Sequence, residues 1–187
     1  MEQAKRRDHK IMITDIAISK VPCVELPGLS RAVCEAIQME HKEILRIAKM
    51  QNDSNEVLSV WNFSKSRKTR VLGLESYVNP ASSPEAYGIL TSSDVGEVMY
   101  LHNHPSTKKF SLADIDTFIS GRNIGLLSVV TNQGEVYILH KSRDYSYRSV
   151  RLLLLHIYDE CFGDTDKMVS MFLHTCGKVG IDYGKSK

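Results

Sequence analysis

The chain has 187 residues, of which 42% are hydrophobic and 25% charged, a balance typical of a globular protein with one core and not of a disordered or fibrous chain. Its formal net charge of +2 is too small to indicate a nucleic-acid-binding surface. No apolar stretch has the length of a membrane span or follows the charged N-terminus as in a signal peptide, so we expect a single cytoplasmic domain and no membrane partner.

The first third of the chain predicts a strand followed by a long helix. Ile11 to Ile18 has the apolar content of a strand, and Pro27-Gly28 separates it from a helix of about twenty residues. One face of that helix is apolar at helical spacing, with Val33, Ile37, Ile44 and Ala48. His41 lies near this face, and we interpret it as a boundary residue and not as a ligand.

A β-hairpin and a short helix are predicted next. Val57 to Phe63 is rich in β-branched and aromatic residues, Ser64 to Lys68 is a polar turn, and Thr69 to Val78 is the second strand. Ser83-Pro84 has the residue types of a helix cap and first helical position, so a short helix should begin there.

The next strand ends in two histidines. Val98 to Leu101 is apolar without helical periodicity, which indicates a buried strand. Side chains two residues apart on a strand point to the same face, so His102 and His104 should lie together at its end, where Pro105 stops it. Taken alone, such a pair also arises by chance.

A helix should begin at Ser111 and bring Asp114 back toward the histidines. Ser111 and Asp114 are three residues apart, so they face the same way on the first turn, and Ile115, Phe118 and Ile119 supply the apolar face behind them. The same two residues also form an ordinary capping box, and both roles can coexist. Together with the histidines they predict a catalytic zinc site, in which three nitrogen and oxygen ligands leave a fourth position for water.

The remaining sequence predicts a second hairpin and a pair of helices. Leu126 to Thr131 and Glu135 to His140 flank an Asn-Gln-Gly turn. A helix through the four leucines 152–155 should end at Gly163, and another from about Thr165 should reach Gly177 as a C-cap. Val179, Ile181 and Tyr183 then alternate as in a last strand. The leucines face several sides of their helix, so this pair is either buried on the domain or part of an interface.

This order of elements indicates an α/β protein of the α+β type. We expect a central mixed, largely antiparallel sheet flanked by helices. Residues 1–187 should form one domain, with a core over about 11–141 and a C-terminal helical extension over 142–187.

The four cysteines, at positions 23, 34, 161 and 176, lack the paired spacing of a structural zinc site. Disulfides are rare in the cytosol, so we expect free thiols. A second metal cluster of Cys161, His174 and Cys176 is conceivable, but Cys34 and Cys161 fall among helical apolar positions, where a role as small buried hydrophobic residues is the preferred interpretation.

The segment His102-Asn103-His104-Pro105-Ser106, with Ser111 and Asp114 after it, resembles the motif of the JAMM (JAB/MPN) metalloprotease superfamily, and within it the bacterial RadC-like branch. The resemblance covers roughly residues 52 to 141. Six residues separate His104 from Ser111, one fewer than in the commonest form of the motif. The resemblance implies a JAB/MPN domain with a cytidine-deaminase-like fold.

The resemblance also implies the roles of the site residues. His102, His104 and Asp114 would hold Zn²⁺, and Ser111 would donate to the oxyanion of the tetrahedral intermediate. The family requires an upstream glutamate on a strand as general base, for which we select Glu75 on the second strand of the first hairpin. Glu56 and Glu97 are the competing candidates, and both are interpreted as charges at strand boundaries.

By this resemblance the chain would be a zinc metallohydrolase. It would be a peptidase or isopeptidase whose substrate is a protein or peptide, with ubiquitin-like modifiers among the candidate substrates. Two other classes stay open. One is a RadC-like accessory protein associated with DNA or mobile elements, although the net charge does not support nucleic-acid binding. The other is a toxin-associated or phage-associated processing module. Oligomeric state and substrate identity are not encoded in any pattern that we find.

Overall fold

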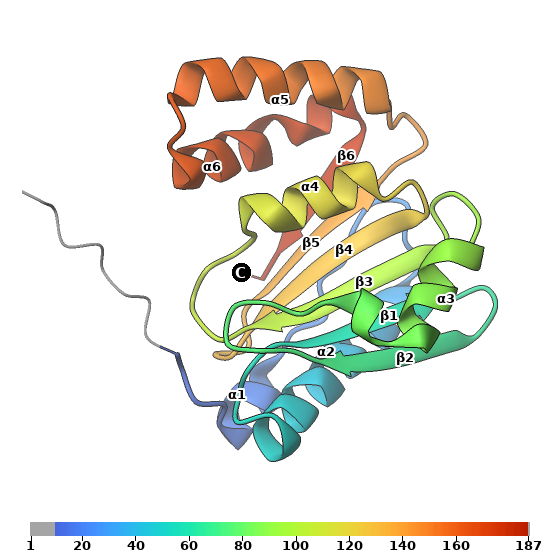
Figure 1. Cartoon of the computed structure of the whole chain (residues 1–187), viewed down its shortest axis with the longest axis vertical. Coiled ribbons are helices and arrows are strands. Elements are labelled where there is room, and N and C mark those ends of the chain that lie inside the picture. The colour runs from blue at the N-terminus through green and yellow to red at the C-terminus, as the bar shows by residue number, and fades with distance from the viewer. Residues whose placement is uncertain (1–9, 187) are drawn as a thin grey trace, which may run out of the picture.

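A computed structural model describes residues 10–186, and in it six strands form one sheet with helices on both sides (Figure 1). The order across the sheet is β2-β1-β3-β4-β5-β6. The strands are β1 (Val57–Asn62), β2 (Arg67–Leu72), β3 (Val98–His104), β4 (Ile124–Thr131), β5 (Val136–Lys141) and β6 (Ile181–Lys185). The helices are α1 (Asp15–Lys20), α2 (Arg31–Gln51), η1 (Pro80–Ser82), α3 (Pro84–Ser92), α4 (Leu112–Ser120), α5 (Tyr147–Cys161), α6 (Thr165–Thr175) and η2 (Cys176–Val179).

The sheet is mixed and mostly antiparallel, as the sequence predicts. Only β3 and β4 run parallel, because α4 connects them as a crossover, and every other neighbouring pair of strands is antiparallel. The strand that carries the histidines therefore lies in the interior of the sheet, hydrogen-bonded on both sides. Among residues 10–186 no helix has both the length and the apolar character needed to traverse a lipid bilayer.

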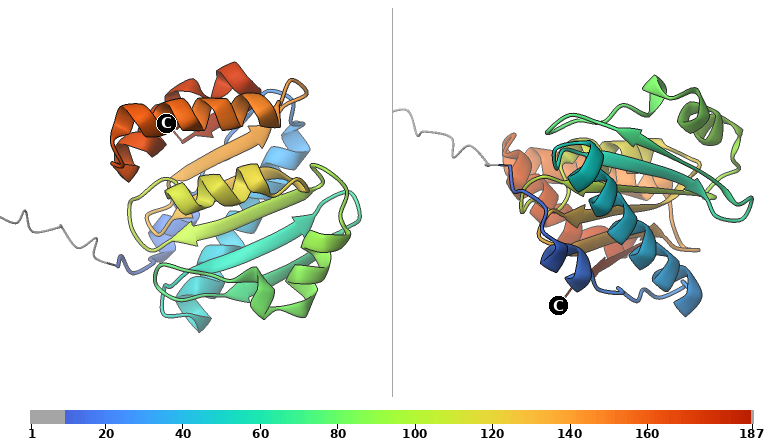
Figure 2. Two further views of the ribbon diagram at one scale, coloured as in Figure 1. Left: turned by 45° about the horizontal axis from the view of Figure 1, so that its top comes forward. Right: turned by 90° about the horizontal axis from the view of Figure 1, so that it is seen from below.

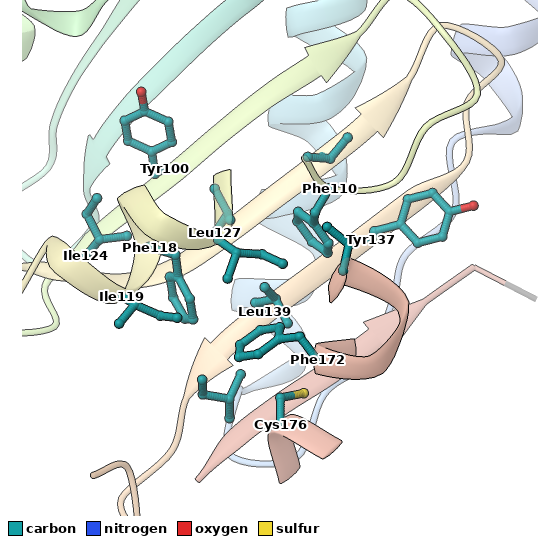
Figure 3. Close-up of a cluster of buried hydrophobic side chains, with 14 of the residues drawn as sticks. Tyr100, Phe110, Phe118, Ile119, Ile124, Leu127, Tyr137, Leu139, Phe172 and Cys176 are labelled. Atoms are coloured by element: carbon teal, nitrogen blue, oxygen red, sulfur yellow. The ribbon is translucent and has the colours of Figure 1, made fainter. Parts of the chain in front are cut away.

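Two hydrophobic clusters hold the helices on the two faces of the sheet (Figure 2). The apolar face of α2 packs against one side, where Leu101 of β3 and Val130 of β4 point toward it. The other side is covered by α4, with α6 and α5 beyond it, and Figure 3 shows Phe118 of α4 near Leu127 and Phe172 of α6 near Leu139 of the sheet. Side chains alternate along β3, so His102 and His104 emerge on the α4 side.

The predicted first strand over Ile11 to Ile18 is wrong. The segment is extended only up to Thr14, whose side chain accepts a hydrogen bond from the backbone N–H of Ala17 and caps α1. The β-branched content favours a strand, but Thr14-Asp15 is a helix start, and the helix buries Ala17 and Ile18.

The predicted strand from Thr69 to Val78 is also too long, because β2 ends at Leu72. The backbone N–H of Leu74 donates to Tyr77 O at 2.7 Å and closes a turn. A Cβ at Gly73 would lie 2.7 Å from the same oxygen, so this close approach requires glycine. Glu75 consequently lies in a loop and not on a strand.

The C-terminal helices differ from prediction at their last cap. Gly177 does not end the helix, because the chain continues from α6 into η2 and turns at Gly180, whose φ is +78°. A Cβ at Gly180 would lie 2.4 Å from the carbonyl carbon of Asp144, so this close approach and the positive φ each exclude a larger residue. The last strand is confirmed for Ile181 and Tyr183, whereas Val179 belongs to η2, and β6 pairs with β5 to complete the sheet.

Candidate metal centre

His102 and His104 close the C-terminal end of β3, both buried, with their rings on the α4 side of the sheet. Their Nε2 atoms lie 3.0 Å apart. The Nδ1 atom of His104 is 3.0 Å from the carbonyl oxygen of Lys108. That oxygen can only accept, so Nδ1 carries the proton and the Nε2 lone pair of neutral His104 points into the site. Among residues 10–186, no partner faces the buried Nδ1 of His102.

The first turn of α4 supplies the third ligand group. The side chain of Ser111 accepts from the backbone N–H of Asp114 at 3.1 Å, and Asp114 Oδ2 accepts from the backbone N–H of Ser111 at 2.6 Å, which is a complete capping box. The hydroxyl of Ser111 also donates to Asp114 Oδ2 at 2.7 Å. The carboxylate of Asp114 thus takes part in the predicted cap and is also the predicted ligand, and the start of α4 holds it in place.

The three predicted ligand groups lie close enough together to surround one ion, since one ligand atom from each lies within 4.8 Å of the others. Asp114 Oδ1 is 3.2 Å from His102 Nε2, and Asp114 Oδ2 is 3.3 Å from His104 Nε2. Four ligands at about 2.0 to 2.1 Å from a tetrahedral zinc ion lie about 3.3 Å from one another. Within the described part of the chain, this is the one cluster of at least three such residues that could hold a metal ion. The donor types and their proximity therefore fit a metal, with one Asp114 oxygen as the third ligand atom.

The charges of these groups favour binding of a cation. Burial by itself raises the pKa of Asp114, but the two histidines beside it and their hydrogen bonds lower that pKa well below its usual range. Burial by itself lowers the pKa of His104, and the hydrogen bond and charge of Asp114 outweigh it and raise that pKa. Asp114 is thus an anion that favours a proton on His104, and a divalent cation would take that proton's place.

Glu56 lies beside this cluster, immediately before β1. Leu58 pairs with His102 across the sheet, so Glu56, two residues earlier, faces the same side of the sheet next to the histidines. It is only 8% exposed, and no hydrogen bond to its carboxylate is found among residues 10–186. Burial raises the pKa of Glu56, while the nearby histidines lower it and Asp114 raises it. Within the described residues, Glu56 is thus a buried carboxylate without a hydrogen-bond partner beside the predicted metal ligands.

Glu75, the predicted general base, is placed less favourably. It lies exposed in the loop after β2 and contributes only to the rim of the cleft. Glu97, the third candidate, pairs with Lys65 at 2.9 Å at the opposite end of β3 and is a boundary charge as expected. The sequence prediction favoured Glu75 because a long second strand was expected to carry it. The signal that points to Glu56 is its position one residue before a strand that pairs with the histidine strand.

Asn103, between the two ligands, points to the other face of the sheet and ties three segments together. Its Oδ1 accepts from the backbone N–H of Val57 at 2.7 Å, and its Nδ2 donates to Asn132 Oδ1 at 2.8 Å and to Asn55 O at 3.1 Å. Asn132 in turn donates to the backbone oxygen atoms of Ile11 and Ser54. This buried network fixes the backbone on both sides of Glu56.

The site opens into a cleft of about 320 Å³. Its floor is formed by the metal cluster and Glu56, and its walls by Lys10, the loop after β2 and the loop between β3 and α4. All five predicted site residues line it: Glu75, His102, His104, Ser111 and Asp114. A cleft of this kind leaves the open side of the metal cluster accessible to a substrate.

The prediction that the cysteines are free thiols is confirmed. All four cysteines are free, and Cys34, Cys161 and Cys176 are buried. Cys161, His174 and Cys176 do not form a metal cluster within residues 10–186. The two cysteines belong to the hydrophobic core instead.

Comparisons with known proteins leave the site to be interpreted from its geometry. The chain matches no protein-family model, no curated protein and no solved structure. The resemblance to the JAMM superfamily therefore rests on the motif and on its spacing.

Proposed function

We propose that this protein is a zinc-dependent hydrolase of the JAMM type that cleaves a peptide or isopeptide bond in a protein substrate. The observation that carries the proposal is the cluster of His102, His104 and Asp114 beside Glu56, a buried carboxylate without a hydrogen-bond partner among residues 10–186. A structural zinc site has four protein ligands, whereas three with an adjoining base and an open cleft are the pattern of a hydrolytic site. We accordingly assign the sheet and its α4 crossover to a JAB/MPN fold.

The ligand types favour zinc over the other common divalent ions. Magnesium and calcium prefer six or more oxygen ligands, and two imidazoles with one carboxylate suit zinc. When bound, the ion would polarise the scissile carbonyl and acidify a water molecule.

Glu56 takes the role of general base in this proposal, in place of Glu75. Its carboxylate would accept the proton of the attacking water and return it to the leaving nitrogen. Because the carboxylate forms no hydrogen bond to residues 10–186, it is free to bond to water and to change protonation state during the reaction.

Ser111 and His104 would act through position and hydrogen bonding. The Ser111 hydroxyl, which here donates to Asp114, would turn toward the oxyanion in the transition state. The hydrogen bond from His104 Nδ1 to Lys108 O would keep its Nε2 directed at the ion. Ser111→Ala should therefore lower kcat by roughly 100-fold to 1,000-fold while KM changes little.

Cleavage of defined substrates tests the proposal. Zinc-loaded protein would be incubated with ubiquitin fused to a peptide through a linear bond, with an isopeptide-linked ubiquitin conjugate and with a general unfolded protein substrate. We expect cleavage of at least one of the three, its loss on chelation, its recovery with zinc and no cleavage by Asp114→Asn. Cleavage that persists in Asp114→Asn, or no cleavage of any of the three by protein shown to contain zinc, would overturn it.

A further inference from the structure

The outward side of α5 carries large apolar side chains that nothing in the described chain covers. Leu152, Leu155, Tyr158 and Phe162 are 60%, 58%, 59% and 94% exposed, and we call these four residues the α5 outer surface. The opposite side of the helix packs on the core through Val150, Ile157 and Cys161. Figure 1 shows α5 as the outermost element, with α6 between it and the sheet.

The arrangement at the end of α5 is unfavourable for an isolated chain. Phe162 caps the helix with φ +49°, in the left-handed region that costs energy for a bulky residue, and it is almost fully exposed. Contiguous exposed apolar residues of this size usually mark an interaction site.

The charges on α5 are reversed relative to its dipole. Arg148 and Arg151 lie near the N-terminus, and Asp159 and Glu160 lie near the C-terminus. A helix is stabilised by acidic residues in its first turn and basic residues in its last, and α5 has neither. A second α5 packed antiparallel would bring each basic end to the acidic, electronegative end of its partner.

We infer that two copies of this chain pair through their α5 outer surfaces, with the helices antiparallel and the two-fold axis near Leu155. In this arrangement Leu155 meets its own copy, and Leu152 approaches Tyr158 of the other chain. Arg148 and Arg151 then lie opposite Phe162 and Asp159, so that cations meet an aromatic ring and a carboxylate. The surface is self-complementary, as an isologous interface must be.

The size of the surface is consistent with a weak, specific dimer. The exposed area of its four side chains is on the order of 500 Å² per chain, so pairing would bury roughly 1,000 Å² in total, near the lower limit of specific interfaces. No residue of α5 lines the metal cleft, so both clefts would stay open in the dimer.

Sedimentation of the full-length protein over a range of concentrations tests the inference. We expect half of the chains to be dimeric at a concentration on the order of 10 to 100 µM, the weak range that goes with an interface of this size. Leu155→Lys should raise that concentration by at least about tenfold. Met39→Lys is the matched control, because Met39 lies midway along another helix with 57% exposure, and it should leave the dimer unchanged.

A charge-reversal pair tests the antiparallel orientation. Arg151→Asp and Asp159→Arg each place like charges at facing ends of the helix pair, so each variant alone should be monomeric at concentrations where the wild type is dimeric. Mixed together they restore opposite charges along the whole length, and a heterodimer should form. A monomeric wild type at millimolar concentration overturns the inference, as does equal weakening by Met39→Lys and Leu155→Lys or a mixture that does not associate.

Discussion

Glu56 and Glu75, the two glutamates at the cleft, have different surroundings. Under the proposed function, this difference distinguishes a reacting carboxylate from a surface charge. Glu56 is buried beside the histidines without a hydrogen-bonding partner among residues 10–186, whereas Glu75 is exposed in a loop. A buried carboxylate without a partner costs stability, so its position calls for a functional explanation. We therefore place the proton-transfer step on Glu56.

Substitution of each glutamate checks this assignment. Glu56→Gln should lower kcat by at least about 100-fold, because the amide cannot accept a proton, while the zinc content stays at the wild-type value. Glu75→Gln is the matched control and should retain activity within about threefold. Both are measured as single-turnover cleavage together with metal analysis. The reverse ranking of the two variants would return the role of base to Glu75.

A second residue-scale prediction concerns His41 of α2, which is fully buried and not at the boundary of the apolar face as expected, with Nε2 2.9 Å from Ser128 Oγ. Burial lowers the pKa of His41 to about 3, below the usual 6.5 of the unfolded chain. The unfolded state therefore binds a proton that the folded state does not, and stability falls as the pH drops below 6.5.

This effect should be about 2 kcal/mol between pH 7.5 and pH 5. His41→Gln removes the titrating group, so urea unfolding of this variant should lose that much less stability over the same pH interval. An identical pH dependence in the two proteins would show that folding does not shift the pKa of His41.

At the scale of elements, the site depends on three segments held by one buried amide pair. Asn103 and Asn132 connect β3 to the start of β1 and to the turn after β4. This network therefore fixes the proposed metal ligands on β3 relative to the proposed base before β1. Strand pairing supplies the remaining alignment, since Leu58 lies opposite His102.

Removal of Asn103 should destabilise this arrangement strongly. Asn103→Ala leaves the backbone N–H of Val57 and the side chain of Asn132 without their buried partner, and we expect a loss of about 2 to 4 kcal/mol in the free energy of unfolding. Gln133→Ala, at an exposed neighbouring position, should change it by less than about 0.5 kcal/mol. Chemical denaturation measures both, and similar small values would show that the network is dispensable.

The elements predicted correctly from the sequence are those with strong local signals. The apolar strand before the histidines, the cap at Ser111 and the long amphipathic α2 each have a distinctive pattern. The α1 helix was mistaken for a strand because β-branched residues dominate a short segment whose conformation depends on packing. Glu56 was discounted for a related reason, since its burial arises from pairing of β1 with β3, in which partners such as Leu58 and His102 are far apart in the sequence.

At the scale of the whole molecule, metal binding joins the sheet to the helical layer. The ligands come from β3 and from the first turn of α4, so a bound ion would tie the two together in the folded state only. Binding to the folded state alone stabilises it by mass action.

Chelation should consequently lower the melting temperature. With free zinc at about 100 times its dissociation constant, the bound protein gains about 2.7 kcal/mol, which corresponds to roughly 5 to 10 °C for a domain of this size. Calorimetry with and without a chelator measures the shift, and Asp114→Asn should show almost none. A shift of the same size in that variant would place the metal elsewhere.

The most direct measurement of the central claim is the zinc stoichiometry of purified protein, obtained by elemental analysis and by calorimetric titration of metal-free protein. The three ligand groups predict one zinc ion per chain, and because Asp114 raises the pKa of His104, zinc should compete with protons for this histidine and bind more weakly as the pH falls. His104→Ala and Asp114→Asn should each lose this ion. No stoichiometric zinc in the wild type, or one equivalent retained by both variants, would contradict the assignment of the metal centre.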